Sequence, residues 1–121
     1  MLQLNWISRD TTGQLLRLYD VNLSTIDVHG VYVIYRSGTV STSPTAIRVG
    51  QGDVADRLQE HRGNSTIKAH AKIGNVYVAF ASVAPLLIDG VERFLVDRYR
   101  PLIGDVIPKV LPVPASLPFA A

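Results

Sequence analysis

Three short apolar segments in the middle of the chain predict the strands of a sheet. Gly30 to Tyr35 reads Gly-Val-Tyr-Val-Ile-Tyr, without polar alternation, which is typical of a strand covered on both faces, so we expect it to be the central strand. Asn75 to Val83 has the same β-branched and aromatic character. Between them, Thr45 to Gly50 follows a loop rich in Ser, Thr and Gly over Arg36 to Pro44, and we expect it to return antiparallel to the first strand.

A helix is predicted directly after the returning strand, within the stretch Ile47 to Arg62. This stretch reads as an apolar strand, a turn with two glycines at Gly50 and Gly52, and then an amphipathic helix. Asp53 is a natural N-cap for that helix, and Gly63 ends it.

A second main helix is predicted over Pro85 to Tyr99. Its apolar face has helical spacing and consists of Ile88, Val91, Leu95 and Tyr99. We expect Pro85 in its first turn, and the dipeptide Arg100-Pro101 ends it. Gly90 weakens a helix by roughly 1 kcal/mol relative to alanine.

The remaining segments are less regular. Met1 to His29 contains a possible edge strand over Gln14 to Tyr19 and a capped turn or short helix over Asn22 to Asp27. Ser65 to Lys72 has the composition of a short helix. A proline-rich apolar tail runs from Pro108 onward, and its expected role is packing on the domain. The order of elements predicts an α+β fold, a small three-stranded antiparallel sheet flanked by helices. We divide the chain into an N-terminal extension (1–29), a central domain (30–104) and a C-terminal tail (105–121).

Composition sets the outer limits of function. The chain has 121 residues, with 47% apolar and 18% charged, as in an ordinary globular domain. It contains no cysteine, which excludes thiolate catalysis and cysteine-ligated zinc. The net charge of +2 permits a phosphate-bearing partner without requiring one. Because no stretch has the length and apolar character of a membrane span or a secretory signal, the expected location is cytoplasmic, without a membrane partner.

Two side chains on the first helix stand among residues that face the core. Val54, Arg57, Leu58 and His61 are spaced so that they share one face. Arg57 either serves a site at the sheet surface or lays its stem on the core and extends its head to water. His61 either serves the same site or satisfies a carbonyl or the helix dipole.

The second helix presents a similar choice at Glu92, one of two glutamates in the chain. Apolar residues lie four positions before it and three and four positions after it: Ile88, Leu95 and Val96. A carboxylate on such a face is costly unless it is paired with a cation or bound to a metal ion. The alternatives are therefore a salt bridge to a core-facing arginine and a metal ligand.

Residues 50–55 formally match the glycine fingerprint of dinucleotide-binding folds, with alanine in the third glycine position. That fingerprint requires a parallel βαβ unit and an acidic residue about 20 positions later. The expected hairpin is antiparallel, and no acidic residue occurs between Glu60 and Asp89. We therefore reject a dinucleotide site.

Five short motifs in order, from about Gly30 to Gly104, resemble the GIY-YIG nuclease family. They are Gly30-Val31-Tyr32, Arg48-Val49-Gly50, Arg57 with Leu58 and His61, Glu92 in Gly-Val-Glu-Arg-Phe-Leu, and Arg100-Pro101-Leu102-Ile103-Gly104. Members of this family hydrolyse phosphodiester bonds with the help of a metal ion.

The resemblance implies a role for each matching residue. Tyr32 would activate or position the attacking water, Arg57 would stabilise charge on the scissile phosphate, and Glu92 would hold Mg²⁺ or Mn²⁺. Arg48, Gly50 and His61 would contribute to phosphate binding or to orientation near Tyr32. The implied function is a metal-dependent endonuclease, with DNA a more probable substrate than RNA only by family habit.

Two positions depart from the family pattern, and they keep a second interpretation open. Arg48 replaces the tyrosine of the second motif, and Gly104 replaces the asparagine after the Arg-Pro segment. Arg48 beside Tyr32 would favour the ionised phenolate and make Tyr32 a better base. Alternatively, the site is degenerate and the domain only binds nucleic acid or protein. In that case a basic surface would carry the binding, made of Arg48, Arg57, Arg62, Lys68 and Lys72. Monomer, homodimer and a complex with a targeting partner all remain compatible with the sequence.

Overall fold

A three-stranded antiparallel sheet forms the centre of the protein, as the sequence predicts. The computed structural model describes residues 1–38, 43–104 and 107–121. The strands are β1 (His29–Arg36), β2 (Thr45–Asp53) and β3 (Val76–Ser82), in the spatial order β2-β1-β3. The run of buried residues in β1 therefore belongs to the central strand, as expected. Part of the predicted loop between β1 and β2, residues 39–42, lies outside the described residues.

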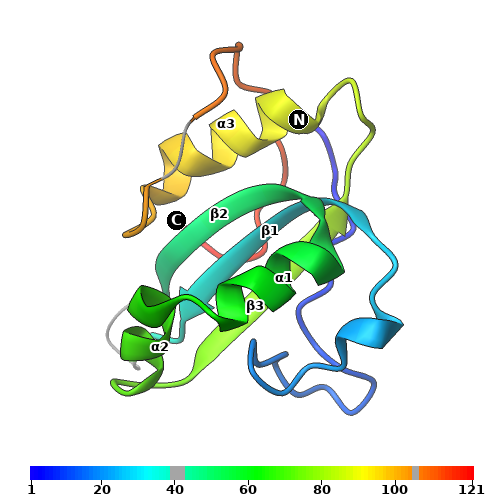
Figure 1. Ribbon diagram of the computed structural model, residues 1–121. Coiled ribbons are helices and arrows are strands. Elements are labelled where there is room, and N and C mark those ends of the chain that lie inside the picture. The colour runs from blue at the N-terminus through cyan, green and yellow to red at the C-terminus, as the bar shows by residue number, and fades with distance from the viewer. Residues whose placement is uncertain (39–42, 105–106) are drawn as a thin grey trace.

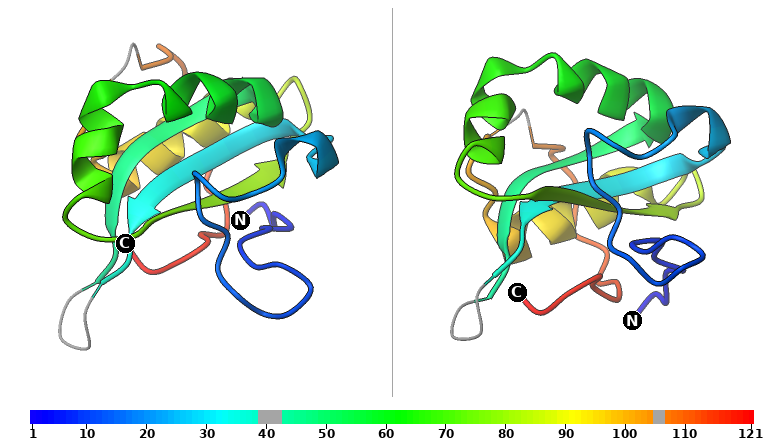
Figure 2. Two further views of the ribbon diagram at one scale, coloured as in Figure 1. Left: turned by 60° about the horizontal axis from the view of Figure 1, so that its bottom comes forward. Right: turned by 90° about the horizontal axis from the view of Figure 1, so that it is seen from below.

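Helices cover both faces of this sheet (Figures 1 and 2). α1 (Val54–Arg62) and α2 (Ser65–Ala71) lie on one face together with a short 3-10 turn, η1 (Leu23–Thr25). α3 (Ile88–Tyr99) lies on the other face, where the N- and C-terminal segments also pass. No helix among the described residues is long and apolar enough to cross a membrane.

The two faces of the sheet carry separate apolar cores. On the α3 face, Val31, Val33 and Val49 pack with Val91 and Leu95 of the helix. The α1 face is built from side chains that alternate with these along the strands, joined by helix residues: Tyr32, Ile34, Val78, Phe80, Val54, Leu58 and Ile67. This alternation is the period of two that a strand imposes on its side chains.

The predicted double-glycine turn before α1 is wrong. β2 continues through both glycines to Asp53, with Gly50 opposite Tyr32 and Gly52 opposite Gly30. Pairing with the central strand outweighs the turn preference of glycine, although Gly52 keeps a positive φ of 126°. The predicted cap is confirmed, because the Asp53 side chain accepts a hydrogen bond from Asp56 N at 3.1 Å.

A β-bulge interrupts the pairing of β1 with β2. Ile34 pairs with Arg48 and Tyr35 pairs with Ala46, so Ile47 is an extra residue in β2. In consequence Ile47 enters the α1-side core, and Arg48 has the register of that same side. Bulges commonly redirect a side chain next to a functional site.

The N-terminal segment does not form the predicted edge strand. It makes isolated bridges to the outer edge of β3 instead, between Ile7 and Phe80 and between Arg17 and Tyr77. Leu18 N donates to Val76 O at 3.0 Å, so this part of the extension still covers the sheet edge. The edge of β3 is shared by two separate parts of the extension, because Ile7 exchanges backbone hydrogen bonds with Phe80 while Leu16 O accepts from Val78 N.

The second main helix begins three residues later than predicted. α3 starts at Ile88, after a turn that contains Pro85, and Leu87 provides no side-chain cap. Its end is as expected, because Arg100 takes the left-handed conformation, with φ at 46°, just before Pro101. Ile88, Val91 and Leu95 are buried, as their spacing predicts.

Candidate active site

A cleft of about 460 Å³ lies beside β2, between α1 and α3. Ten of the described residues line it: Tyr32, Arg48, Gly50, Gln51, Arg57, Glu60, His61, Asp89, Glu92 and Pro108. Every residue that the sequence nominated for the site is among them, although they come from β1, β2, α1 and α3. The structure thus brings together nominated residues that are up to 60 positions apart in the chain, Tyr32 and Glu92.

The best-defined contact in the cleft is between Tyr32 and His61. The phenol oxygen lies 2.6 Å from His61 Nε2, and the two rings are tilted by 54°. Only 2% of Tyr32 and 5% of His61 is exposed. A histidine on the buried face of α1 is thereby hydrogen-bonded to a side chain of β1, which explains why it can occupy a core-facing position.

Gly50 leaves the space that the Tyr32 ring occupies. A Cβ atom at position 50 would overlap the hydroxyl and the ring of Tyr32, its partner across the strand pair. Gly50 therefore acts on the site by having no side chain, which lets the phenol lie across β2 toward the cleft. This is a close approach rather than the turn that the sequence suggested.

Arg57 lies at the rim of the cleft. Its Nε donates to Gln51 O at 3.3 Å, and its Nη1 is 3.2 Å from Glu60 Oε2. The side chain is 49% exposed, so the residue borders the site while its head meets solvent. An exposed ion pair of this kind contributes about 0–1 kcal/mol, so little energy holds Arg57 away from an incoming anion.

Glu92 and Asp89 both face the cleft from α3, one turn apart. Gln51 Nε2 donates to Asp89 Oδ1 at 2.6 Å, which joins β2 to the first turn of α3. The half-buried Glu92 also borders a smaller apolar cavity of about 160 Å³ formed with Val49, Val96 and Ile103. The carboxylate thus stands between an apolar pocket and the polar cleft.

The charges of the cleft bear on metal binding. In the described part of the lining, two guanidinium groups, of Arg48 and Arg57, accompany three carboxylates, of Glu60, Asp89 and Glu92, which gives these residues one excess negative charge when His61 is neutral. A phosphate diester is itself an anion, so a divalent cation would be needed to make this lining attractive to it.

The donor set fits one kind of metal site. Across residues 1–38, 43–104 and 107–121, no three His, Asp or Glu side chains gather closely enough to hold an ion. Mg²⁺ is commonly bound through one or two carboxylates, several waters and substrate phosphates, and Glu92 with Asp89 in reach of the same cleft suits that arrangement.

The residues of the predicted basic surface are divided between the cleft and other parts of the protein. Arg62 does not line the cleft. Its guanidinium donates to Leu18 O at 2.8 Å and to Val21 O, which fastens the N-terminal segment to α1. Lys68 and Lys72 are exposed at α2 and do not line the cleft either. Among the described residues, the arginines and lysines that line the cleft are Arg48 and Arg57.

Comparison with known protein families, curated proteins and solved structures gives no match for this chain. The resemblance to GIY-YIG nucleases therefore rests on the residues of the chain itself.

Four lining residues had no signal strong enough to select them from the sequence: Gln51, Glu60, Asp89 and Pro108. Asp89 was detectable in principle, because it lies three positions before Glu92 and so shares its helix face. Gln51 lay within the wrongly predicted turn. As a strand residue opposite Val31, it points to the α3 face, where Asp89 accepts its hydrogen bond.

Proposed function

We propose that this protein is a metal-dependent phosphodiesterase of the endonuclease type, acting on nucleic acid at the cleft beside β2. The observation that carries the proposal is the meeting of Tyr32, His61, Arg57 and Glu92 at one cleft from three different elements. Each belongs to a motif that resembles the GIY-YIG pattern. Their chemistry is complementary, since hydrolysis needs a proton acceptor, a cation for the developing charge and a ligand for a metal ion.

The Tyr32–His61 pair supplies the proton acceptor. With neutral Nε2 as the acceptor, the phenol donates to His61, and its oxygen keeps a lone pair for a water in the cleft. Water then gives a proton to the phenol oxygen as the phenol proton passes to Nε2. A bond forms between the water oxygen and phosphorus, the bond to the leaving oxygen breaks with its electron pair, and the leaving oxygen takes a proton from solvent water. His61 ends as imidazolium and Tyr32 is unchanged.

Glu92 would hold Mg²⁺ or Mn²⁺, and such an ion supplies Lewis-acid polarisation of the phosphoryl oxygens and offsets the excess negative charge of the lining. Arg57 faces the same phosphate from the opposite helix. To reach it, the guanidinium exchanges its exposed contact with Glu60 for a phosphate oxygen, a bidentate partner that arginine favours.

Cleavage of supercoiled plasmid and of single-stranded DNA tests this proposal, with Mg²⁺, Mn²⁺ or EDTA. We expect metal-dependent nicking that falls at least about 100-fold in Glu92→Gln, Arg57→Gln and Tyr32→Phe, in line with the loss of one electrostatic or proton-transfer group. Asp97→Asn is the matched control, because it removes an exposed carboxylate of α3 that pairs with Arg93 outside the cleft.

The opposite result has a definite meaning. Absence of cleavage, together with salt-sensitive DNA binding that survives Glu92→Gln, would overturn the proposal. It would establish the alternative, a binding module with a degenerate site. Cleavage that the three cleft variants leave intact would place the activity elsewhere.

A further inference from the structure

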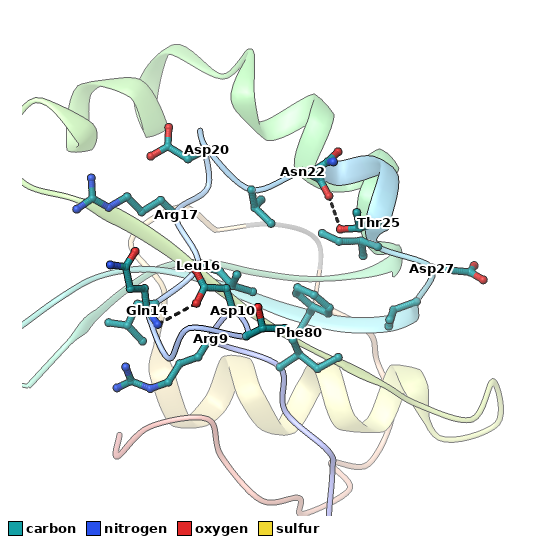
Figure 3. Close-up of a pocket in the computed structure, with 16 residues that line it drawn as sticks. Arg9, Asp10, Gln14, Leu16, Arg17, Asp20, Asn22, Thr25, Asp27 and Phe80 are labelled. Atoms are coloured by element: carbon teal, nitrogen blue, oxygen red, sulfur yellow. Dashed lines mark hydrogen bonds between the residues drawn. The ribbon is translucent and has the colours of Figure 1, made fainter.

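A second and larger pocket, of about 840 Å³, lies between two loops of the N-terminal segment at the outer edge of β3 (Figure 3). One loop spans residues 7–17 and the other spans residues 20–28. Seven apolar side chains line it: Ile7, Leu15, Leu16, Val21, Ile26, Val28 and Phe80. The volume lies within the range of small-molecule sites, which are mostly apolar with a few placed polar groups.

The polar groups of this pocket are distributed unevenly. Figure 3 shows the heads of Arg9, Gln14 and Arg17 at one end and Asn22 with Thr25 at the other. Arg9 Nη1 donates to Gly13 O at 2.7 Å, which holds this side chain on its own loop and leaves further guanidinium donors. Two exposed guanidinium groups therefore lie at one end of the pocket, on side chains that extend outward with Gln14 between them.

Three aspartates also line the pocket, and their positions decide its preference. The Asp10 carboxylate accepts hydrogen bonds from Thr12 N, Thr12 Oγ1 and Gln14 N, at 2.6–3.0 Å, so the turn of its own loop engages it. Figure 3 shows Asp27 at the end remote from the arginines, with its carboxylate pointing away. Asp20 lies close to Arg17 in the chain, and its backbone N donates a hydrogen bond to Arg17 O. Its carboxylate is therefore the one of these three that could compete with a bound anion at the arginine end of the pocket.

We propose that this pocket binds a small amphipathic anion, with its apolar body against Leu16, Val28 and Phe80 and its anionic head at the end of the pocket where the exposed Arg9 and Arg17 lie. A medium-chain fatty carboxylate has this chemistry. The apolar part would gain burial against the lining, and the head would form charge-assisted hydrogen bonds with the guanidinium groups. The site is separate from the proposed phosphodiesterase cleft, since no residue in the described part of the chain lines both pockets.

Calorimetric titration of the full chain tests the proposal with three probes below their micelle concentrations. These are decanoate, acetate and decyltrimethylammonium. We expect saturable binding of decanoate alone. Arg17→Gln should weaken it about threefold to tenfold, as the loss of a charge-assisted hydrogen bond predicts. Asp20→Asn should strengthen it about twofold, because it removes the competing carboxylate.

Two further variants control the interpretation. Lys72→Gln removes a positive charge at α2, away from the pocket, and should leave binding unchanged. Thr11→Trp places a large side chain at an exposed lining position and should abolish binding. In methyl NMR spectra, decanoate should shift Leu16 and Val28 but not Leu86, which is 99% exposed on a different loop.

Several results would overturn the proposal. One is equally tight binding of decyltrimethylammonium, which would show that the arginines do not select the head group. The others are equal effects of Arg17→Gln and Lys72→Gln, and decanoate binding that Thr11→Trp leaves intact.

Discussion

At the residue scale, the site depends on a residue without a side chain as much as on the groups that do chemistry. Tyr32 crosses β2 at Gly50, and its hydroxyl reaches His61 at 2.6 Å. The sequence indicated that both Gly50 and Tyr32 belong to the site, but it assigned Gly50 to a turn and Tyr32 to the attacking water. Only the strand register shows that one makes room for the other.

This dependence predicts the effect of Gly50→Ala. The added methyl group would overlap the Tyr32 ring, so we expect a loss of about 1–3 kcal/mol in the free energy of unfolding and a displaced phenol. Urea unfolding measures the first, and the proposed DNA cleavage measures the second.

Gly74→Ala is the matched control for that experiment. A Cβ atom at position 74 would meet nothing within 4 Å, and the residue has no positive φ, so stability should change by less than about 0.5 kcal/mol. If the two variants have equal stability, the close approach of Tyr32 to Gly50 does not constrain the strand pair.

At the element scale, local patterns were sufficient for much of the fold. The uninterrupted apolar run of β1 indicated a central strand, and the spacing of Ile88, Val91 and Leu95 gave the buried face of α3. Both depend on side-chain periodicity, which neighbouring residues in the sequence determine.

The features that local patterns missed all depend on partners distant in the chain. The bulge at Ile47 arises from pairing with β1, and β2 runs through Gly50 and Gly52 because that pairing is available. The cleft residues Gln51 and Asp89 meet only after α3 has packed beside β2.

At Gly90, too, the local sequence does not reveal a contact with a distant part of the chain. Helix propensity alone predicts that Gly90→Ala would raise the free energy of unfolding by about 1 kcal/mol. In the structure the C-terminal tail crosses α3 here. A Cβ atom would lie 2.5 Å from Val113 Cγ2 and 3.0 Å from Leu111 O. Val113 N also donates to Gly90 O at 2.9 Å.

We therefore expect Gly90→Ala to lower the free energy of unfolding by about 1 kcal/mol, because overpacking exceeds the gain in propensity. Thermal unfolding measures the change. The same substitution in a Val113→Ala background should be neutral or stabilising. A stabilising effect of Gly90→Ala in the wild-type background would contradict the packing of the tail on α3.

At the scale of the whole molecule, the two terminal segments close the α3 face together. Leu2 N donates to Pro114 O at 3.0 Å, and Ser116 N donates to Leu2 O at 2.8 Å. Trp6 Nε1 donates to Ser116 O at 2.8 Å. The Tyr99 hydroxyl donates to Phe119 O at 2.5 Å, and the two rings are 4.7 Å apart.

This closure predicts a loss of stability at high pH. Burial raises the pKa of Tyr99 to about 12 from a usual value of 10.0. A raised pKa means that folding favours the neutral phenol, so its contribution is complete below pH 10 and is lost as the pH rises through 12. The free energy of unfolding should fall by about 1–3 kcal/mol over this interval.

Urea unfolding between pH 9 and 12 measures this loss. Tyr99→Phe should show a shallower decline in stability with pH than the wild type over the interval from about 10 to 12. Tyr19→Phe is the comparison, since burial also raises the pKa of Tyr19 but its hydroxyl does not bind the C-terminal tail. Parallel pH profiles for wild type and Tyr99→Phe would contradict a buried phenol at this position.

The fit of Tyr32 over Gly50 also limits the order in which this chain can change through evolution. While tyrosine occupies position 32, any side chain at position 50 would overlap its ring, so almost every substitution at Gly50 would be destabilising. Once Tyr32 is replaced by a smaller residue, position 50 becomes free to vary, and a later return to tyrosine is then blocked. The loss of the proposed catalytic tyrosine would thus become irreversible after one further step.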